Sequence, residues 1–155
     1  MKSMNWSKII LGGLVAGLIV NIFEFVVNGV ILVEDWAAAM QALGKSAETT
    51  PAQMTTYVVW GFLMGLAAVW LYASIRPRYG AGPKTAICAG AAVWWLAYFM
   101  AMVPPALMDI MPVRLMMIGV VVGLVEILLG TVAGASLYKE ESAAPLASSA
   151  AGAGS

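Results

Sequence analysis

Four long apolar runs constrain this chain more than any other feature of its sequence. They contain only two acidic residues, Glu24 and Glu126, and they predict helices over 9–33, 54–75, 85–103 and 113–138. At 1.5 Å per residue, the first run reaches about 37 Å, whereas a bilayer's hydrocarbon core is about 30 Å thick. Backbone polar groups within lipid must be satisfied inside their own segment, which favours helices. We therefore expect an all-α membrane protein, a bundle of four transmembrane helices.

Composition supports this class and excludes several functions. Of the 155 residues, 62% are hydrophobic and only 10% are charged, whereas a typical soluble domain has about 25% charged residues. The chain has no histidine and one cysteine, Cys88, which excludes His-ligated haem, a Cys/His nucleophilic pair and an internal disulfide. Balanced charge without a basic cluster argues against nucleic acid as a partner. We expect no catalytic residues, no metal site, no cofactor and no enzymatic activity.

The distribution of lysine and arginine predicts the topology. Residues 1–8 form a cytoplasmic N-terminal segment, 9–138 the transmembrane domain, and 139–155 a low-complexity tail that we expect to be disordered. The outer connections contain two basic residues, Lys45 and Arg114, and the other side has six. Basic residues favour the cytoplasmic side, so both termini are predicted to be cytoplasmic. The six are Lys2, Lys8, Arg76, Arg78, Lys84 and Lys139.

The outer connection that follows the first run carries a further helical pattern. Its segment from Trp36 to Leu43 has apolar residues at a spacing that suits an amphipathic helix. We expect a short helix there, lying on the membrane surface.

The first and fourth helices each place their polar and small residues on one narrow face. At 100° per residue, each set falls within about 80° of the helix circumference. The similar patterns indicate a weak inverted repeat, and their glycines fit small-xxx-small packing. We therefore expect these two helices to pack together. The sets are Gly13, Gly17, Asn21, Glu24 and Asn28 in the first helix, and Gly119, Gly123, Glu126, Gly130 and Gly134 in the fourth.

The two glutamates form the candidate site. Both are expected near the membrane midplane, facing each other or a shared cavity, with Asn21, Asn28, Trp94 and Tyr98 as available partners. No lysine or arginine lies at that depth, so desolvation and mutual repulsion favour a proton on at least one carboxyl. Two interpretations stay open: a proton or cation pathway, and a hydrogen-bonded clamp between helices.

Several short motifs together suggest a family. They are Met4-Asn5-Trp6, Trp36-xxx-Met40 followed by Ala42-Leu43-Gly44, Gly82-Pro83-Lys84, and Met111-Pro112-Val113-Arg114. With them, the stretch from Met4 to Tyr138 resembles a group of small bacterial four-helix membrane proteins classed as a domain of unknown function. The resemblance implies an inner-membrane location and no established activity, and it transfers no functional residues. The chain departs from that group by having Glu24 and Asn28 where aromatic residues are common.

These observations lead to two hypotheses about function. The first is a non-enzymatic structural or accessory membrane subunit, surrounded by the lipid bilayer, that forms a homo-oligomer or joins a larger membrane complex. Small residues of the second helix, Gly61, Gly65 and Ala68, motivate the association because they could form an exposed packing face. The alternative is a small proton-coupled transporter or channel that uses the Glu24/Glu126 pair.

Overall fold

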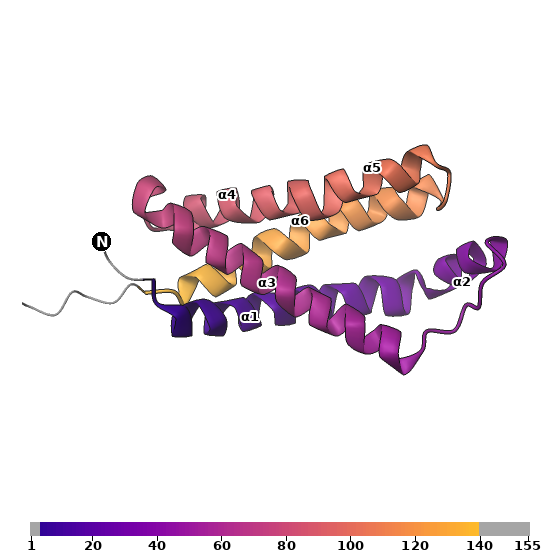
Figure 1. Ribbon diagram of the computed structural model, residues 1–155, viewed down its shortest axis with the longest axis horizontal. Helices are drawn as coiled ribbons and strands as arrows, with labels where there is room; N and C mark the ends of the chain where they lie inside the picture. The colour runs from indigo at the N-terminus through magenta and orange to yellow at the C-terminus, as the bar shows by residue number, and fades with distance from the viewer. Residues whose placement is uncertain (1–3, 140–155) are drawn as a thin grey trace, which may run out of the picture.

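The computed structural model describes residues 4–139, and this part of the chain consists of helices and their connections (Figure 1). Four helical spans are long and apolar enough to cross a membrane: Trp6–Ile31, Pro51–Tyr79, Pro83–Leu107 and Val113–Ser136. The all-helical fold with four such spans therefore matches the sequence expectation. The predicted disordered tail lies outside the described residues from position 140 onward.

The first span joins an α-helix to a π-helical turn. Helix α1 (Trp6–Val26) begins where the side chain of Asn5 accepts a hydrogen bond from the backbone N–H of Lys8. Segment η1 (Val27–Ile31) is π-helical, and Leu32, with φ −104° and ψ 12°, ends the span. Helix α2 (Val33–Ala42) follows in a new direction, so the short helix expected in this connection is present. The span thus begins three residues before the predicted helix 9–33 and ends two residues before its predicted end.

The other three spans also extend beyond or fall short of their apolar runs. Helix α3 (Pro51–Tyr79) starts early because Thr50 and Gln53 form a capping box. The third span consists of α4 (Pro83–Trp94), π-helical η2 (Trp95–Phe99) and α5 (Met100–Leu107). It continues past the predicted end at residue 103, because Pro104 and Pro105 lie within α5 and do not end the helix there. Helix α6 (Val113–Ser136) closes the bundle.

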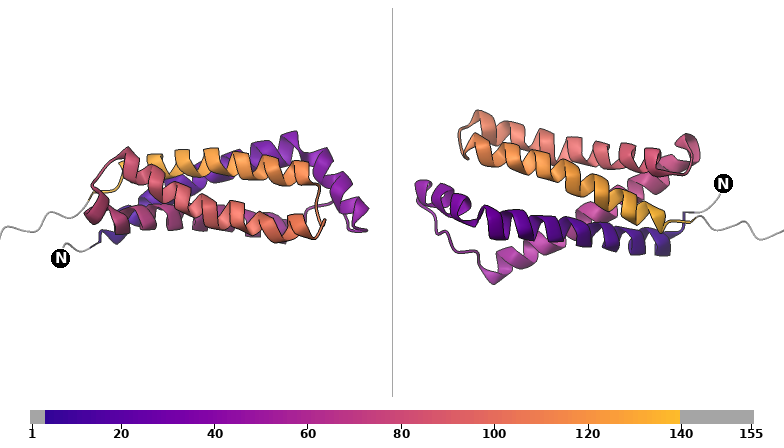
Figure 2. Two further views of the ribbon diagram at one scale, coloured as in Figure 1. Left: turned by 90° about the horizontal axis from the view of Figure 1, so that it is seen from above. Right: turned by 180° about the vertical axis from the view of Figure 1, so that it is seen from behind.

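Successive spans run in opposite directions, so that both ends of the described chain lie at the same end of the bundle as the α3–α4 turn (Figures 1 and 2). The views show α4 and α5 on one side and α1 and α2 on the other, with α3 crossing diagonally and α6 sloping from the end of α5 to the start of α1. Helix α1 packs against both α3 and α6.

Small residues bring the backbones of these helices together. A Cβ added to Gly134 of α6 would collide with the carbonyl oxygen of Gly12 in α1, and one added to Gly130 would collide with Ala16. On the neighbouring face of α1, Gly17 approaches Gly65 of α3 equally closely. The glycines therefore determine how near α1 can lie to its two partners.

The small-residue face of α3 is not exposed, which corrects the sequence interpretation. Gly61, Gly65 and Ala68 are all buried inside the bundle. They lie there because α1 packs on this face through Gly13 and Gly17. These residues thus hold the single chain together and give no support for self-association.

Candidate functional site

Glu126 is the one acidic side chain of the described residues that is fully buried, with 0% of its surface exposed. It projects from the middle of α6 towards α1 and the third span. Its Oε1 accepts a hydrogen bond of 2.7 Å from the hydroxyl of Tyr98, and its Oε2 is buried without a hydrogen-bond partner. A buried polar atom without a partner carries a substantial free-energy cost, so it marks this position as unusual.

The second carboxyl of the site comes from Glu24, which is half-buried near the end of α1. Its carboxyl lies within electrostatic and hydrogen-bonding reach of Glu126. No hydrogen bond of good geometry is formed to the free Oε2 of Glu126. The structure thus places two acidic side chains from antiparallel helices next to each other, with one oxygen lacking its bond.

Tyr98 is positioned by the π-helical turn η2 and by a glycine of α6. The tyrosine ring lies directly on Gly123, where an added Cβ would collide with ring carbons Cδ1 and Cε1. Because the glycine has no side chain, the ring can lie close against α6 and its hydroxyl can reach Glu126 one turn away. Gly123 therefore makes room for an aromatic ring, whereas Gly130 and Gly134 allow two helix backbones to come into contact.

Asn28 and Trp36 extend the site towards α2. Asn28 lies in η1, and its Nδ2 donates a hydrogen bond of 2.6 Å to Oε2 of Glu24. The indole Nε1 of Trp36 in α2 donates to Oδ1 of Asn28 at 2.9 Å. Two hydrogen-bonded segments therefore meet at the pair of carboxyls: one joins Trp36 and Asn28 to Glu24, and the other joins Tyr98 to Glu126. We call Trp36, Asn28, Glu24, Glu126 and Tyr98 the carboxyl network.

Two further candidate residues make their bonds elsewhere. Asn21 donates to the carbonyl oxygens of Gly17 and Val58, so it links α1 to α3 away from the carboxyls. Trp94 donates its indole N–H to the carbonyl oxygen of Val120 at 2.8 Å and links α4 to α6. Among the candidate packing glycines, Gly119 meets no atom within contact distance.

Among residues 4–139, no basic group lies next to the carboxyl network. Every lysine and arginine of the described residues lies in the first or last turn of a helix or in a connection. Arg114, for example, pairs with Asp35 at 3.0 Å at the exposed α2 end of the bundle. No cluster of three metal-binding side chains occurs within residues 4–139. The two carboxyls therefore lie close together without a lysine or arginine of the described chain beside them.

Two features of the network had no signal in the sequence. Both residues that hydrogen-bond the carboxyls, Asn28 and Tyr98, lie in π-helical turns, which are frequent at functional sites. Trp36 becomes a partner of Asn28 only because the chain changes direction at Leu32. Neither a π-helical turn nor this change of direction follows from hydrophobic periodicity.

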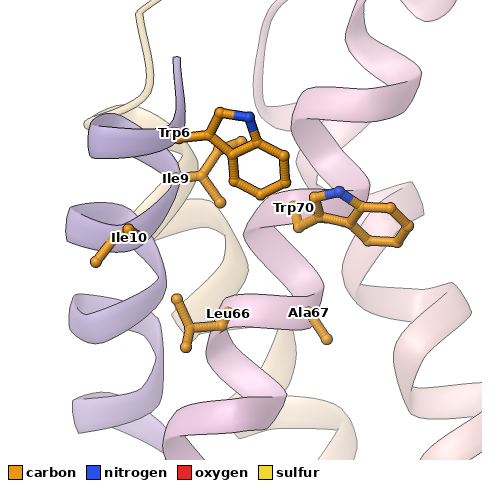
Figure 3. A pocket seen from close by; sticks show the side chains of 6 residues that line it. All are labelled: Trp6, Ile9, Ile10, Leu66, Ala67 and Trp70. Carbon is orange, nitrogen blue, oxygen red and sulfur yellow. The ribbon is translucent and has the colours of Figure 1, made fainter. Parts of the chain in front are cut away.

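A separate hollow lies between the first turns of α1 and the second half of α3 (Figure 3). It has a volume of about 390 Å³ and presents an apolar lining. No carboxyl is among its residues, so it is distinct from the carboxyl network. Its lining consists of Trp6, Ile9, Ile10, Leu66, Ala67 and Trp70.

Comparisons with known proteins give no match: no family model, no curated protein and no solved structure is significantly similar to this chain.

Proposed function

We propose that this protein is a multi-pass protein of the bacterial inner membrane, without enzymatic activity, that serves as a structural or accessory subunit. Four apolar spans support membrane insertion. The excess of basic residues at the end of the bundle where the described chain begins and ends supports a cytoplasmic location for that end. The resemblance to small bacterial four-helix membrane proteins is consistent with this location.

The observation that carries the structural role is the use of polar side chains as links between helices. Asn21 joins α1 to α3, Trp94 joins α4 to α6, and Tyr98 joins the third span to Glu126. Together with the glycine contacts, these links hold the spans in one arrangement. A rigid apolar unit of this kind is suited to support a larger membrane assembly.

Support for association comes from aromatic residues on the outside of the bundle. Trp95 lies in the middle of the third span, is 49% exposed and stacks on Phe99. Hydrocarbon offers no acceptor for an indole N–H, so a second protein surface would stabilise Trp95 better than lipid does. The same reasoning applies to Trp60 of α3, which is 60% exposed.

Native mass spectrometry of the protein released directly from its own membrane with bound lipid tests this proposal. We expect an oligomer or a complex with another membrane protein, and we expect Trp95→Phe to reduce its abundance. Trp6→Phe is the matched control, because Trp6 lies at the end of its span where the indole N–H reaches the membrane interface. A monomer in every lipid preparation would contradict the proposal.

A proton-coupled transporter or channel is the second candidate, and the unpaired Oε2 of Glu126 next to Glu24 favours it. Vesicles containing the protein and a pH-sensitive dye test this candidate. It predicts a proton flux that Glu24→Gln and Glu126→Gln abolish, while Glu34→Gln, an exposed control, leaves the flux unchanged. The absence of protein-dependent flux in the unsubstituted protein would exclude it.

A further inference from the structure

The buried oxygen of Glu126 without a partner is the starting point. Oε1 of the same carboxyl accepts a hydrogen bond from Tyr98, and Glu24 lies within electrostatic reach of this carboxyl. Two ionised carboxylates at this place would repel each other and leave an acceptor buried without a donor. One proton held between the two carboxyls removes the repulsion and supplies the missing bond.

We propose that Glu24 and Glu126 together bind a single exchangeable proton, and that this proton enters and leaves through Glu24 on the α2 side of the bundle. In the bound state an O–H bond on one carboxyl donates to the other carboxylate, and the pair carries one negative charge. On release the proton passes to water and the pair carries two negative charges. The inference rests on the proposed membrane location, and it does not require transport.

The groups around the pair are consistent with a proton as the ligand. The titratable side chains facing it are Tyr98 from η2 and the two glutamates from α1 and α6. Helix α3 contributes Met64 and Ala68 to the adjoining cluster, and neither of them titrates. The basic residues of the described chain lie at the helix ends, so none of them neutralises the pair.

Access differs between the two directions along the bundle. Towards α2, Glu24 is half-buried, and Asn28 and Trp36 act as positioning residues that hold its carboxyl. In the opposite direction, Val20 and Ile127 are fully or almost fully buried. Beyond them, Ala16 and Gly130 bring the two backbones into contact. This packing closes the direction of the α3–α4 turn, whereas the side chain of Glu24 remains partly exposed on the α2 side.

Infrared difference spectroscopy of the full chain in lipid vesicles, with glutamate carrying ¹³C in its side-chain carboxyl, tests the bound proton. We expect one protonated-carboxyl band per chain at neutral pH that shifts with the label and disappears at high pH. Glu24→Gln and Glu126→Gln should each abolish the band, because the amide N–H supplies the missing donor. Glu34→Gln and Glu48→Gln, at exposed positions, should retain it.

The result for the unsubstituted protein decides the proposal even where a variant fails to fold. A spectrum without a protonated glutamate would overturn it. If the band persists in Glu126→Gln or in Glu24→Gln, the remaining carboxyl binds the proton alone. That result would overturn the proposal that the two carboxyls share one proton. Asn28→Leu should shift the frequency of the band, whereas Asn21→Leu should not, because Asn21 bonds to α3.

Sidedness is tested with vesicles in which the protein has one orientation. A pH step applied to the face carrying α2 should change the band, and the same step on the opposite face should leave it unchanged. An equal response from both faces would overturn one-sided access. A titrating band in a protein that carries no proton flux supports this inference and excludes the transport candidate, so the two proposals fail separately.

Discussion

Two halves of the contact between α1 and α6 are built in different ways. Near the termini, Gly12 meets Gly134 and Ala16 meets Gly130, so the helices touch through their backbones. Towards α2, the same helices meet through Glu24 and Glu126 and the polar side chains around them. The half near the start of α1, which we call the backbone half, tolerates almost no added volume. It sets the separation of the two helices, and this separation lets the carboxyls meet in the other half, which we call the polar half.

The largest expected effect is therefore in the backbone half. Gly134→Val should destabilise the protein by about 3 kcal/mol or more, since the added side chain collides with the carbonyl of Gly12. Gly119→Val on the same helix is the matched control, because Gly119 faces open space. Unfolding by denaturing detergent in mixed micelles measures both variants. Equal losses of stability would mean that the close backbone contact does not exist.

Substituting a glycine of the polar half should destabilise the protein less, and it should act by displacing an aromatic ring. Gly123→Ala should cost about 2 kcal/mol, because the methyl group pushes the ring of Tyr98 away from α6 and from Glu126. Gly119→Ala provides the control at a position one turn away. The same detergent unfolding measures the loss, and tyrosine infrared bands should report the displaced hydroxyl. A Gly123→Ala protein as stable as Gly119→Ala would contradict the placement of the ring.

Removing one hydrogen bond of the carboxyl network should cost less again. Tyr98→Phe should reduce the free energy of unfolding by about 1 kcal/mol, since hydrogen bonds between membrane helices contribute about 0.6 to 2 kcal/mol. Tyr57→Phe is the control, because Tyr57 is 64% exposed at the end of α3. If the two variants are equally stable, Tyr98 does not hold the buried carboxyl.

The outer end of the network should be the least sensitive. Trp36→Phe removes the indole N–H that donates to Asn28. We expect the free energy of unfolding to fall by about 0.5 kcal/mol, because this part of the site is only half-buried. Trp6→Phe, at a 60% exposed position at the end of α1, should change stability less. A double variant with Asn28→Leu should show a non-additive loss, since the two residues share one bond. Strict additivity would separate Trp36 from the network.

Much of the fold could be predicted from the sequence because the physical signals are strong. Apolar runs of this length predict four spans, and their number and order agree with the structure. The spacing of four residues predicts Asn28 near Glu24 on an α-helix, and the hydrogen bond is present although Asn28 lies in the π-helical turn η1. Helical periodicity together with membrane depth was sufficient to suggest that Glu24 and Glu126 lie near each other.

The remaining features depend on relations between elements that periodicity does not contain. Gly12 and Gly13 lie 100° apart on α1, and the structure turns Gly12 towards α6 and Gly13 towards α3. Asn21 shares a helix face with Glu24 in projection, yet it bonds to the carbonyl of Val58 in α3. The π-helical turns and the break at Leu32 also determine which side chains meet, and the amino-acid composition of these segments does not predict them.

Solid-state NMR of the protein in lipid, with ¹³C only in the glutamate side-chain carboxyls, tests the central claim most directly. The account predicts a cross-peak between the carboxyl carbons of Glu24 and Glu126, assigned through Glu24→Gln and Glu126→Gln. The exposed Glu34 and Glu48 serve as internal controls and should give no cross-peak to either member of the pair. A spectrum in which Glu24 and Glu126 show no contact would contradict the carboxyl pair. It would also contradict the transport candidate and the shared proton, because both depend on that pair.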